Sequence, residues 1–259
     1  GSNYRLVADI DFEGKAPIRL SRFTGNIMGD RHRLLNARWS ATQPSALLDR
    51  NDGLIRDLVI EGFRIEGHPG STPDRLALIV LRNRGTLRNV RGGEGNRIDL
   101  GSPAATRDPA SANEDEDLLP VSAWRVGGLT SENSGMIEDC DWMIQVTIQP
   151  ASEAVGGIVA WNRGTLRRVT ARAWMNAMSG TGVGGVAGVN VGEVRQARLE
   201  FVPFEVQRGE MRTTPSRVVG LSSVGGIVGR NLGTIAQASV WASVQGEQDA
   251  GGDAGLNAK

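Results

Sequence analysis

The chain has 259 residues, of which 35 are glycine, 39% are apolar and 5% are aromatic. Its 29 basic and 29 acidic residues cancel to a net charge of zero, which argues against a nucleic-acid partner because dedicated nucleic-acid-binding proteins are usually strongly basic. No apolar run approaches the roughly 18 residues of a membrane-spanning helix, so we expect no membrane insertion. The single cysteine excludes an internal disulfide framework.

The first 44 residues precede the repeats, and we interpret them as a lead-in to the same structure. Asp9, Asp11 and Glu13 alternate as in an oxygen-rich calcium loop, but the rest of an EF-hand is missing. Hydrogen bonding within a turn is therefore the favoured interpretation. His32 and His68 are the only histidines, and no His-Glu-x-x-His motif accompanies them. We predict no metal ion and no cofactor.

From residue 45 onwards the motif Asn-x-Gly recurs six times, and four of these copies carry a Gly-Gly pair that begins six residues before the asparagine. A seventh copy reaches Asn257 and the sequence stops at Lys259. We therefore expect the chain to be a piece of a longer protein. Gly1-Ser2 is typical of an expression scar, so we also expect the natural N-terminus to be missing. The repeat asparagines are Asn51, Asn83, Asn133, Asn162, Asn190 and Asn231, and the glycine pairs begin at Gly127, Gly156, Gly184 and Gly225.

Three positions are apolar in every complete copy. They lie four residues before the asparagine and four and seven residues after it, as in Ile158, Leu166 and Val169. Short β-branched segments separated by glycine and asparagine are typical of strands and turns. The copies are too short to contain crossover helices, so equivalent positions should stack in parallel, one turn above the next. We predict an all-β chain that folds as a right-handed parallel β-helix, or β-solenoid.

The repeated turn residues have physical explanations. Neighbouring turns lie about 4.8 Å apart, so stacked asparagine side chains can hydrogen-bond to one another as an amide ladder. An asparagine at a tight turn can take positive φ and the glycine that follows it tolerates positive φ, while the Gly-Gly pair allows a bend where any Cβ would clash. Seven turns, with one or two more from the lead-in, would give a rod of roughly 40 Å.

Unequal copy lengths indicate two insertions. Successive asparagines are 32, 50, 29, 28 and 41 residues apart, so the basal turn is about 28 residues and the excess marks inserted segments. We place the first insertion at about residues 92–123, which include the acidic run Glu114–Asp117, and the second at residues 201–222. Both are expected to be loops on a single domain that covers residues 1–259.

Three segments of the chain resemble the GLUG-motif family of repeat proteins. Tyr4–Asp11 matches the opening pattern Y-x-L-x-x-D-I-D of that family, Phe23–Leu34 matches F-x-G-x-x-x-G-x-x-H-x-I, and Val224–Ile235 is almost a consensus copy of V-G-G-L-V-G-x-N-x-G-x-I. The resemblance implies an exported, surface-associated bacterial protein. Haemagglutinin-like adhesins and the non-catalytic regions of IgA-specific metalloendopeptidases carry such repeats, so the resemblance implies no single activity.

Two groups of residues are candidates for catalysis. Glu138, Asp139 and Asp141 form the only compact acidic group within a copy, and polysaccharide-cleaving β-helices need paired carboxylates on an exposed wall. Their neighbours match the apolar positions of the other copies, so polar turn residues are the favoured interpretation. Cys140 occupies the apolar position that Val169 holds in the next copy, which indicates a buried side chain and not a nucleophile. We predict no catalytic residue.

Surface residues remain as candidates for binding. Five residues after the asparagine, arginine recurs in a column that Glu138 and Ala236 interrupt. Stacking would turn this column into a basic stripe able to bind sulfated or acidic glycans, although an ordinary solvated wall is the favoured interpretation. Trp142, Trp161 and Trp174 could stack on sugars if they are exposed. The arginines of the stripe are Arg56, Arg88, Arg167 and Arg195.

These observations favour a non-catalytic structural or adhesive segment of a large secreted bacterial surface protein, which acts as a stalk or as a binding surface. The expected location is extracellular or on the bacterial cell surface. The expected partners are a host or matrix protein or glycan, and the remainder of the parent protein. Two alternatives stay open: an accessory substrate-binding domain of a large secreted protease, and a β-helix enzyme that acts on polysaccharides.

Overall fold

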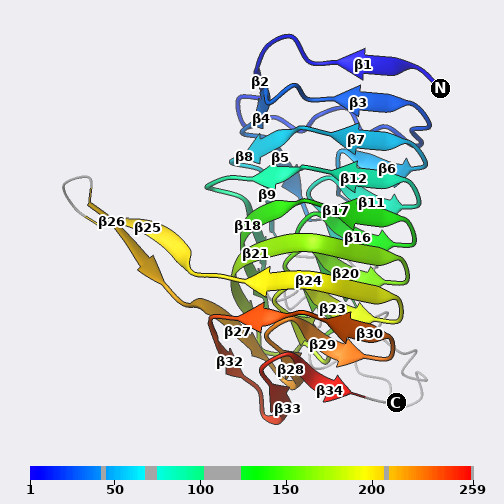
Figure 1. Cartoon of the computed structure of the whole chain (residues 1–259). Helices are drawn as coiled ribbons and strands as arrows, with labels where there is room; N and C mark the ends of the chain where they lie inside the picture. The colour runs from blue at the N-terminus through cyan, green and yellow to red at the C-terminus, as the bar shows by residue number, and fades with distance from the viewer. Residues whose placement is uncertain (42–44, 68–74, 102–123, 207–209, 258–259) are drawn as a thin grey trace, which may run out of the picture.

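The computed structural model describes residues 1–41, 45–67, 75–101, 124–206 and 210–257. In these ranges the chain is all-β, and its strands form three parallel sheets and one two-stranded antiparallel hairpin. The described ranges contain no helix with the length and apolarity that crossing a membrane would require. Figure 1 shows the strands stacked in successive levels from the N-terminus to the C-terminus.

Two of the parallel sheets follow the repeat directly. The strands of the asparagine sheet end at the repeated asparagines. The strands of the glycine sheet end at the first glycine of each pair, except the first strand, which ends at Ala77 in a copy without the pair. The asparagine sheet consists of β6 (Leu48–Asn51), β11 (Val80–Asn83), β16 (Thr130–Asn133), β20 (Val159–Asn162), β23 (Ala187–Asn190), β29 (Val228–Asn231) and β34 (Ala254–Asn257). The glycine sheet consists of β10 (Arg75–Ala77), β15 (Trp124–Gly127), β19 (Ser152–Gly156), β22 (Val183–Gly184), β28 (Ser222–Gly225) and β33 (Gln248–Gly251).

The remaining wall is a 19-stranded parallel sheet, here called the long sheet. Its strands are β1 (Asn3–Arg5), β2 (Ile10–Asp11), β3 (Asn26–Met28), β4 (Arg33–Leu35), β5 (Arg38–Ser40), β7 (Leu54–Arg56), β8 (Val59–Glu61), β9 (Arg64–Gly67), β12 (Thr86–Arg88), β13 (Arg91–Gly92), β14 (Arg97–Leu100), β17 (Met136–Glu138), β18 (Asp141–Ile148), β21 (Thr165–Ala177), β24 (Glu193–Leu199), β27 (Ser216–Gly220), β30 (Thr234–Ala236), β31 (Ser239–Val240) and β32 (Ala242–Gln245). β25 (Val202–Val206) and β26 (Glu210–Thr214) form the hairpin.

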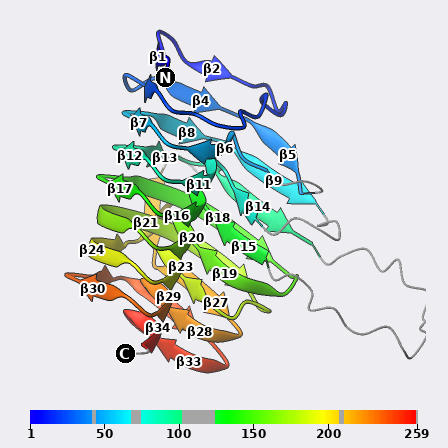
Figure 2. The same ribbon diagram turned by 90° about the vertical axis from the view of Figure 1, so that its right-hand side faces the viewer.

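One turn of the chain visits the three sheets in a fixed order. β19 lies in the glycine sheet, β20 follows in the asparagine sheet and β21 follows in the long sheet; β22, β23 and β24 then repeat this path one level further along. β1 pairs with β3 and β3 pairs with β7, so the lead-in adds two levels to the long sheet. Figure 2 shows these levels from the side. Long parallel sheets of this kind are consistent with a parallel β-solenoid.

Equivalent positions of the repeat stack in register, as the sequence predicts. Asn133 pairs with Asn162 across the asparagine sheet, and Ile137 pairs with Leu166 across the long sheet. All the remaining successive copies pair in the same register at the apolar position four residues after the asparagine. Because parallel pairing places equivalent residues side by side, the inward side chains form continuous aliphatic columns.

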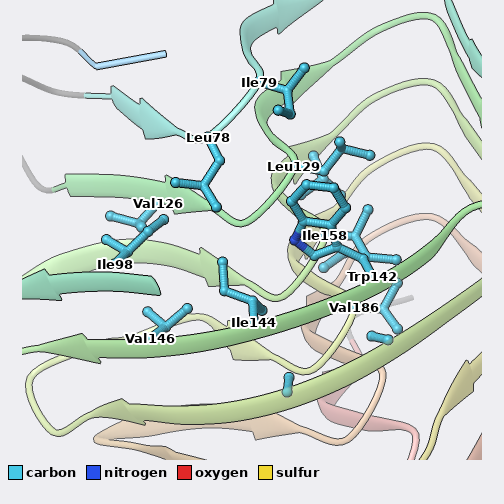
Figure 3. Packing of buried hydrophobic residues seen from close by; sticks show 14 of the residues in the cluster. Leu78, Ile79, Ile98, Val126, Leu129, Trp142, Ile144, Val146, Ile158 and Val186 are labelled. Carbon is cyan, nitrogen blue, oxygen red and sulfur yellow. The ribbon is translucent and has the colours of Figure 1, made fainter. Parts of the chain in front are cut away.

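These columns fill one apolar core that runs through the stack. Ile158, Leu166 and Val169 have no exposed surface. Trp142 is also fully buried, and Figure 3 shows it among the aliphatic side chains of the cluster, with Leu129 labelled nearby. Burying each large apolar side chain stabilises the fold by roughly 1.5–3 kcal/mol. Repeated over every level, this burial accounts for the regular apolar positions of the sequence.

The repeated asparagines form an amide ladder along the whole asparagine sheet. In every level from Asn51 to Asn231, the side-chain Nδ2 donates to the Oδ1 of the next asparagine at 2.8 Å, and the series ends at Asn257. The same Nδ2 also donates to the backbone oxygen of the glycine two residues later, at 3.2–3.3 Å. The buried amides are therefore paired, which removes the free-energy cost of burying them.

The turn geometry differs from the prediction in one respect. In the described copies neither the ladder asparagines nor the glycines two residues later have positive φ; it occurs instead six residues after the asparagine, as in Asp139 (55°), Arg168 (50°) and Gln196 (54°). Each asparagine is the last residue of a strand and so keeps an extended backbone. The glycine is needed for close approach, since a Cβ on Gly164 would lie 2.1 Å from the backbone oxygen of Gly135 one level earlier.

The Gly-Gly pair allows the bend that the sequence predicts for it. A Cβ on Gly156 would lie 1.9 Å from the backbone oxygen of Val159 in the same turn. A Cβ on Gly157 would lie 2.1 Å from the backbone oxygen of Gly185 in the next level. Both positions therefore exclude larger residues on steric grounds.

Parts of both predicted insertions belong to the long sheet. Residues 92–101 include part of β13 and all of β14, which pair with strands of the long sheet on both sides; the rest of the first insertion, including Glu114–Asp117, lies outside the described residues. In the second insertion β25 and β26 form a hairpin that extends away from the stack (Figure 1). β27 then returns to the long sheet by pairing with β21 and β32.

Candidate functional site

The predicted arginine stripe is assembled by the long sheet. Arg56 pairs in register with Arg88, and this column continues through Glu138 and Arg167 to Arg195. Each arginine of the stripe contacts a carboxylate: Asp57 is 3.0 Å from Arg56, Glu138 binds both Arg88 and Arg167, and Glu193 binds Arg195. The stripe is therefore a line of ion pairs, which leaves little positive charge for an anionic ligand.

The acidic group at the centre of this wall is held ionised. Glu138 is 3% exposed, and its hydrogen bond from Arg167, with a further one from Arg88, lowers the pKa of its carboxyl. A hydrogen bond from Arg168 lowers the pKa of Asp139 in the same way, and Arg172 binds Asp141. A general acid at neutral pH needs the opposite shift of its pKa. These contacts favour the interpretation of the three residues as structural.

Cys140 is buried as a member of the apolar core. Burial raises the pKa of its thiol to about 12. Because the thiolate is the nucleophilic form of cysteine, a thiol with this pKa is unreactive at neutral pH. Its position matches the buried side chain that the sequence predicts.

The acidic residues of the lead-in are occupied by local hydrogen bonds. Asp9 accepts hydrogen bonds from the backbone and the side chain of Arg33, which lower the pKa of its carboxyl, and the Nδ1 of His32 lies 3.4 Å from it. Asp11 accepts a hydrogen bond from the backbone N–H of Glu13 at 2.8 Å, which is the turn arrangement favoured by the sequence. Among the described residues no group of three or more histidine, cysteine or acidic side chains is placed to hold a metal ion.

The three tryptophans named in the sequence lie in three different environments. Trp142 is fully buried, so the stacking of a sugar on it is excluded. Trp174 is 44% exposed on β21, between Gln145 of β18 and Arg217 of β27. It lines a hollow of about 320 Å³ together with Pro203, at the base of the hairpin. An exposed indole bordered by amide and guanidinium groups is suited to stacking on a sugar ring; we call this site the tryptophan hollow.

Trp161 belongs to a second hollow, of about 430 Å³, on the outer face of the asparagine and glycine sheets. The guanidinium carbon of Arg125 lies 4.7 Å from the centre of the Trp161 ring, and that of Arg163 lies 5.8 Å from it. Arg82 and Arg84 line the same hollow from β11 and the turn after it. We call this site the arginine hollow.

Sequence reasoning missed the arginine hollow because its residues occupy no regular column. Arg82 and Arg84 flank Asn83, whereas the corresponding residues beside Asn162 are Trp161 and Arg163, and the intervening copy has Glu132 and Ser134. The charge therefore does not repeat with the period of the turn. The available signal was the clustering of arginine immediately beside two of the ladder asparagines, which places these residues on one outer face.

A comparison with known proteins does not assign the chain to a family. No protein-family model matches its sequence. No curated protein is significantly similar to it. The functional argument therefore rests on the geometry of the two hollows and of the wall that carries them.

Proposed function

We propose that the chain is a right-handed β-solenoid that serves as a non-catalytic structural or adhesive segment of a large secreted bacterial surface protein. In this role the stack is a stiff stalk, and its outer face is a binding surface for a host or matrix protein or glycan. The resemblance of the lead-in and repeats to GLUG-motif proteins supports the exported, surface-associated part of the proposal.

The observation that carries the proposal is the uninterrupted amide ladder, which runs along the stack together with a continuous apolar core. Six hydrogen bonds of 2.8 Å join seven levels, and the glycine positions beside them exclude larger residues. A stack of this kind resists bending because each level is tied to the next by backbone and side-chain hydrogen bonds. Most of the repeated sequence is therefore explained by mechanical continuity.

The alternatives of an accessory protease domain and a polysaccharide-active enzyme are less well supported. A glycan-cleaving site needs a proton donor near neutral pH. The compact acidic group at Glu138 is instead paired with arginines that favour its ionised form. The tryptophan hollow is consistent with sugar binding by any of the three classes, so an experiment has to separate binding from turnover.

To test the proposal, the full chain is coupled to beads, and the fraction of beads retained on immobilised glycans and matrix proteins is measured. The same protein is assayed for the release of reducing ends from neutral and uronate polysaccharides. We expect retention without release, and we expect Trp174→Ala to reduce retention on glycans. Tyr4→Ala, which removes an exposed aromatic side chain in the lead-in, is the matched control. Release of reducing ends that Glu138→Gln abolishes would contradict the non-catalytic assignment.

A further inference from the structure

The arginine hollow carries positive charge that the protein itself does not neutralise. Arg82, Arg84 and Arg163 are exposed, and none of them pairs with a carboxylate in the described part of the chain. Neighbouring arginines differ in this respect: Arg50 pairs with Asp52 at 2.7 Å. The three free guanidinium groups therefore form a local concentration of charge on a protein whose net charge is zero.

The floor of the hollow is fixed by a network of ion pairs. Glu132 accepts hydrogen bonds from Arg75 at 2.9 Å and from Arg125 at 2.8 Å, and these contacts lower the pKa of its carboxyl against the effect of burial. Arg125 also binds Glu153 at 3.0 Å. Because this network holds Arg125 over the Trp161 ring, the hollow has a preformed wall before any ligand arrives.

Arg163 is positioned on Trp161 without the loss of its hydrogen-bonding capacity. A guanidinium group that stacks on an aromatic ring keeps its N–H groups in its own plane, where they can bind a carboxylate, sulfate or phosphate in paired fashion. Arg84 and Arg163 each follow a ladder asparagine, and these asparagines lie two levels apart, which corresponds to about 10 Å along the stack. The free donors are thus spaced for two oxyanions on one extended ligand.

We propose that the arginine hollow binds an acidic polysaccharide through its sulfate or carboxylate groups, with Arg82, Arg84 and Arg163 as the contacting residues. A nucleic acid fits less well, because the two guanidinium groups beside Trp161 restrict base stacking on its ring. Glu132 and Glu153, which both bind Arg125 of the hollow, also confine the positive field to a short segment. The inference deepens the proposed function, since it assigns a ligand class to the binding surface.

The experiment measures the affinity of the full chain for a heparin oligosaccharide, an oligogalacturonate, inorganic sulfate and an oligothymidylate of matched charge. The hollow is removed by the combined variant Arg82→Gln, Arg84→Gln and Arg163→Gln. The control variant is Arg5→Gln, Arg38→Gln and Arg195→Gln, which removes the same charge from exposed arginines that each pair with a carboxylate. All six positions are exposed, so both variants should fold, which circular dichroism and urea unfolding check.

We expect at least one oligosaccharide to bind, and the hollow variant to bind it at least about tenfold more weakly, as the loss of three exposed charge-assisted contacts implies. The control variant should stay within about twofold of the unaltered chain. The two oligosaccharides distinguish sulfate from carboxylate as the recognised group. Binding of neither oligosaccharide, equal losses in the two variants, tighter binding of oligothymidylate, or equally tight binding of free sulfate would each overturn the proposal. These variants retain Trp174 and the ladder, so bead retention and reducing-end release still report on the proposed function separately.

Discussion

Arg167 donates a hydrogen bond to the carboxylate of Glu138, which lies in the preceding turn of the long sheet. Arg88, one turn before Glu138, donates to its other oxygen. Glu138 was expected to interrupt a basic stripe; in the structure it joins the arginines on either side of it and cancels much of their charge. The stripe therefore contributes to the cohesion of the wall.

Replacing Glu138 with glutamine should destabilise the protein by about 2 kcal/mol at neutral pH, because two arginines lose a largely buried ionised partner. Since the arginines lower the pKa of Glu138 in the folded state, this stabilisation is present above the ordinary carboxyl pKa and is lost as the pH falls through the lowered one. Urea unfolding of the two proteins should thus converge at acid pH. Glu193→Gln, which removes a more exposed partner of Arg195, should change stability by less than about 1 kcal/mol. A stability difference that does not diminish below pH 4 would show that the ion pairs are not its cause.

Replacing Asn162 with alanine should interrupt the amide ladder at its centre. The Nδ2 of Asn133 and the Oδ1 of Asn190 would each lose a ladder hydrogen bond in a buried environment, at a cost of about 2–4 kcal/mol in the free energy of unfolding. Asn176→Ala, on the outer side of β21, is the control and should cost less than about 1 kcal/mol. Urea-induced unfolding measures both values, and equal effects would contradict a special role for the ladder.

The space around each glycine predicts that two glycine-to-alanine substitutions will differ in their effect on stability. Gly164→Ala would place a methyl group 2.1 Å from the backbone oxygen of Gly135, and should destabilise the stack by at least about 2 kcal/mol. Gly252→Ala adds the same group where no atom lies within 4 Å, and should be neutral. Thermal unfolding of the two variants distinguishes close packing from a general requirement for glycine.

Cys140 should be protected from thiol reagents in the folded protein. With a pKa of about 12 and no exposed route, its thiol should react with a disulfide reagent at pH 8 only after denaturation. Because the unfolded thiol ionises near pH 8.5–9 while the folded one stays protonated, this group should lower stability progressively as the pH rises above that range. Rapid labelling of the native protein at pH 8 would contradict this assignment.

Much of the fold followed from periodicity, because a parallel stack repeats each environment and so repeats each residue type. The apolar positions, the ladder asparagines and the burial of Cys140 were predictable on that basis. The position of positive φ was not, since Asp139, Arg168 and Gln196 share no side-chain chemistry that would mark it. The arginine hollow was not predictable either, because its charges come from unequal copies that only the three-dimensional register brings together.

The ladder hydrogen bond between Asn83 and Asn133 spans 50 residues, whereas that between Asn162 and Asn190 spans 28, yet both measure 2.8 Å. The geometry of the stack is therefore independent of the length of chain within a turn. A foreign segment placed between residues 101 and 124 would need only to return the chain to the start of β15, whatever its own size. The molecule consequently offers a scaffold into which peptides or whole domains can be inserted without a change in the stack that carries them.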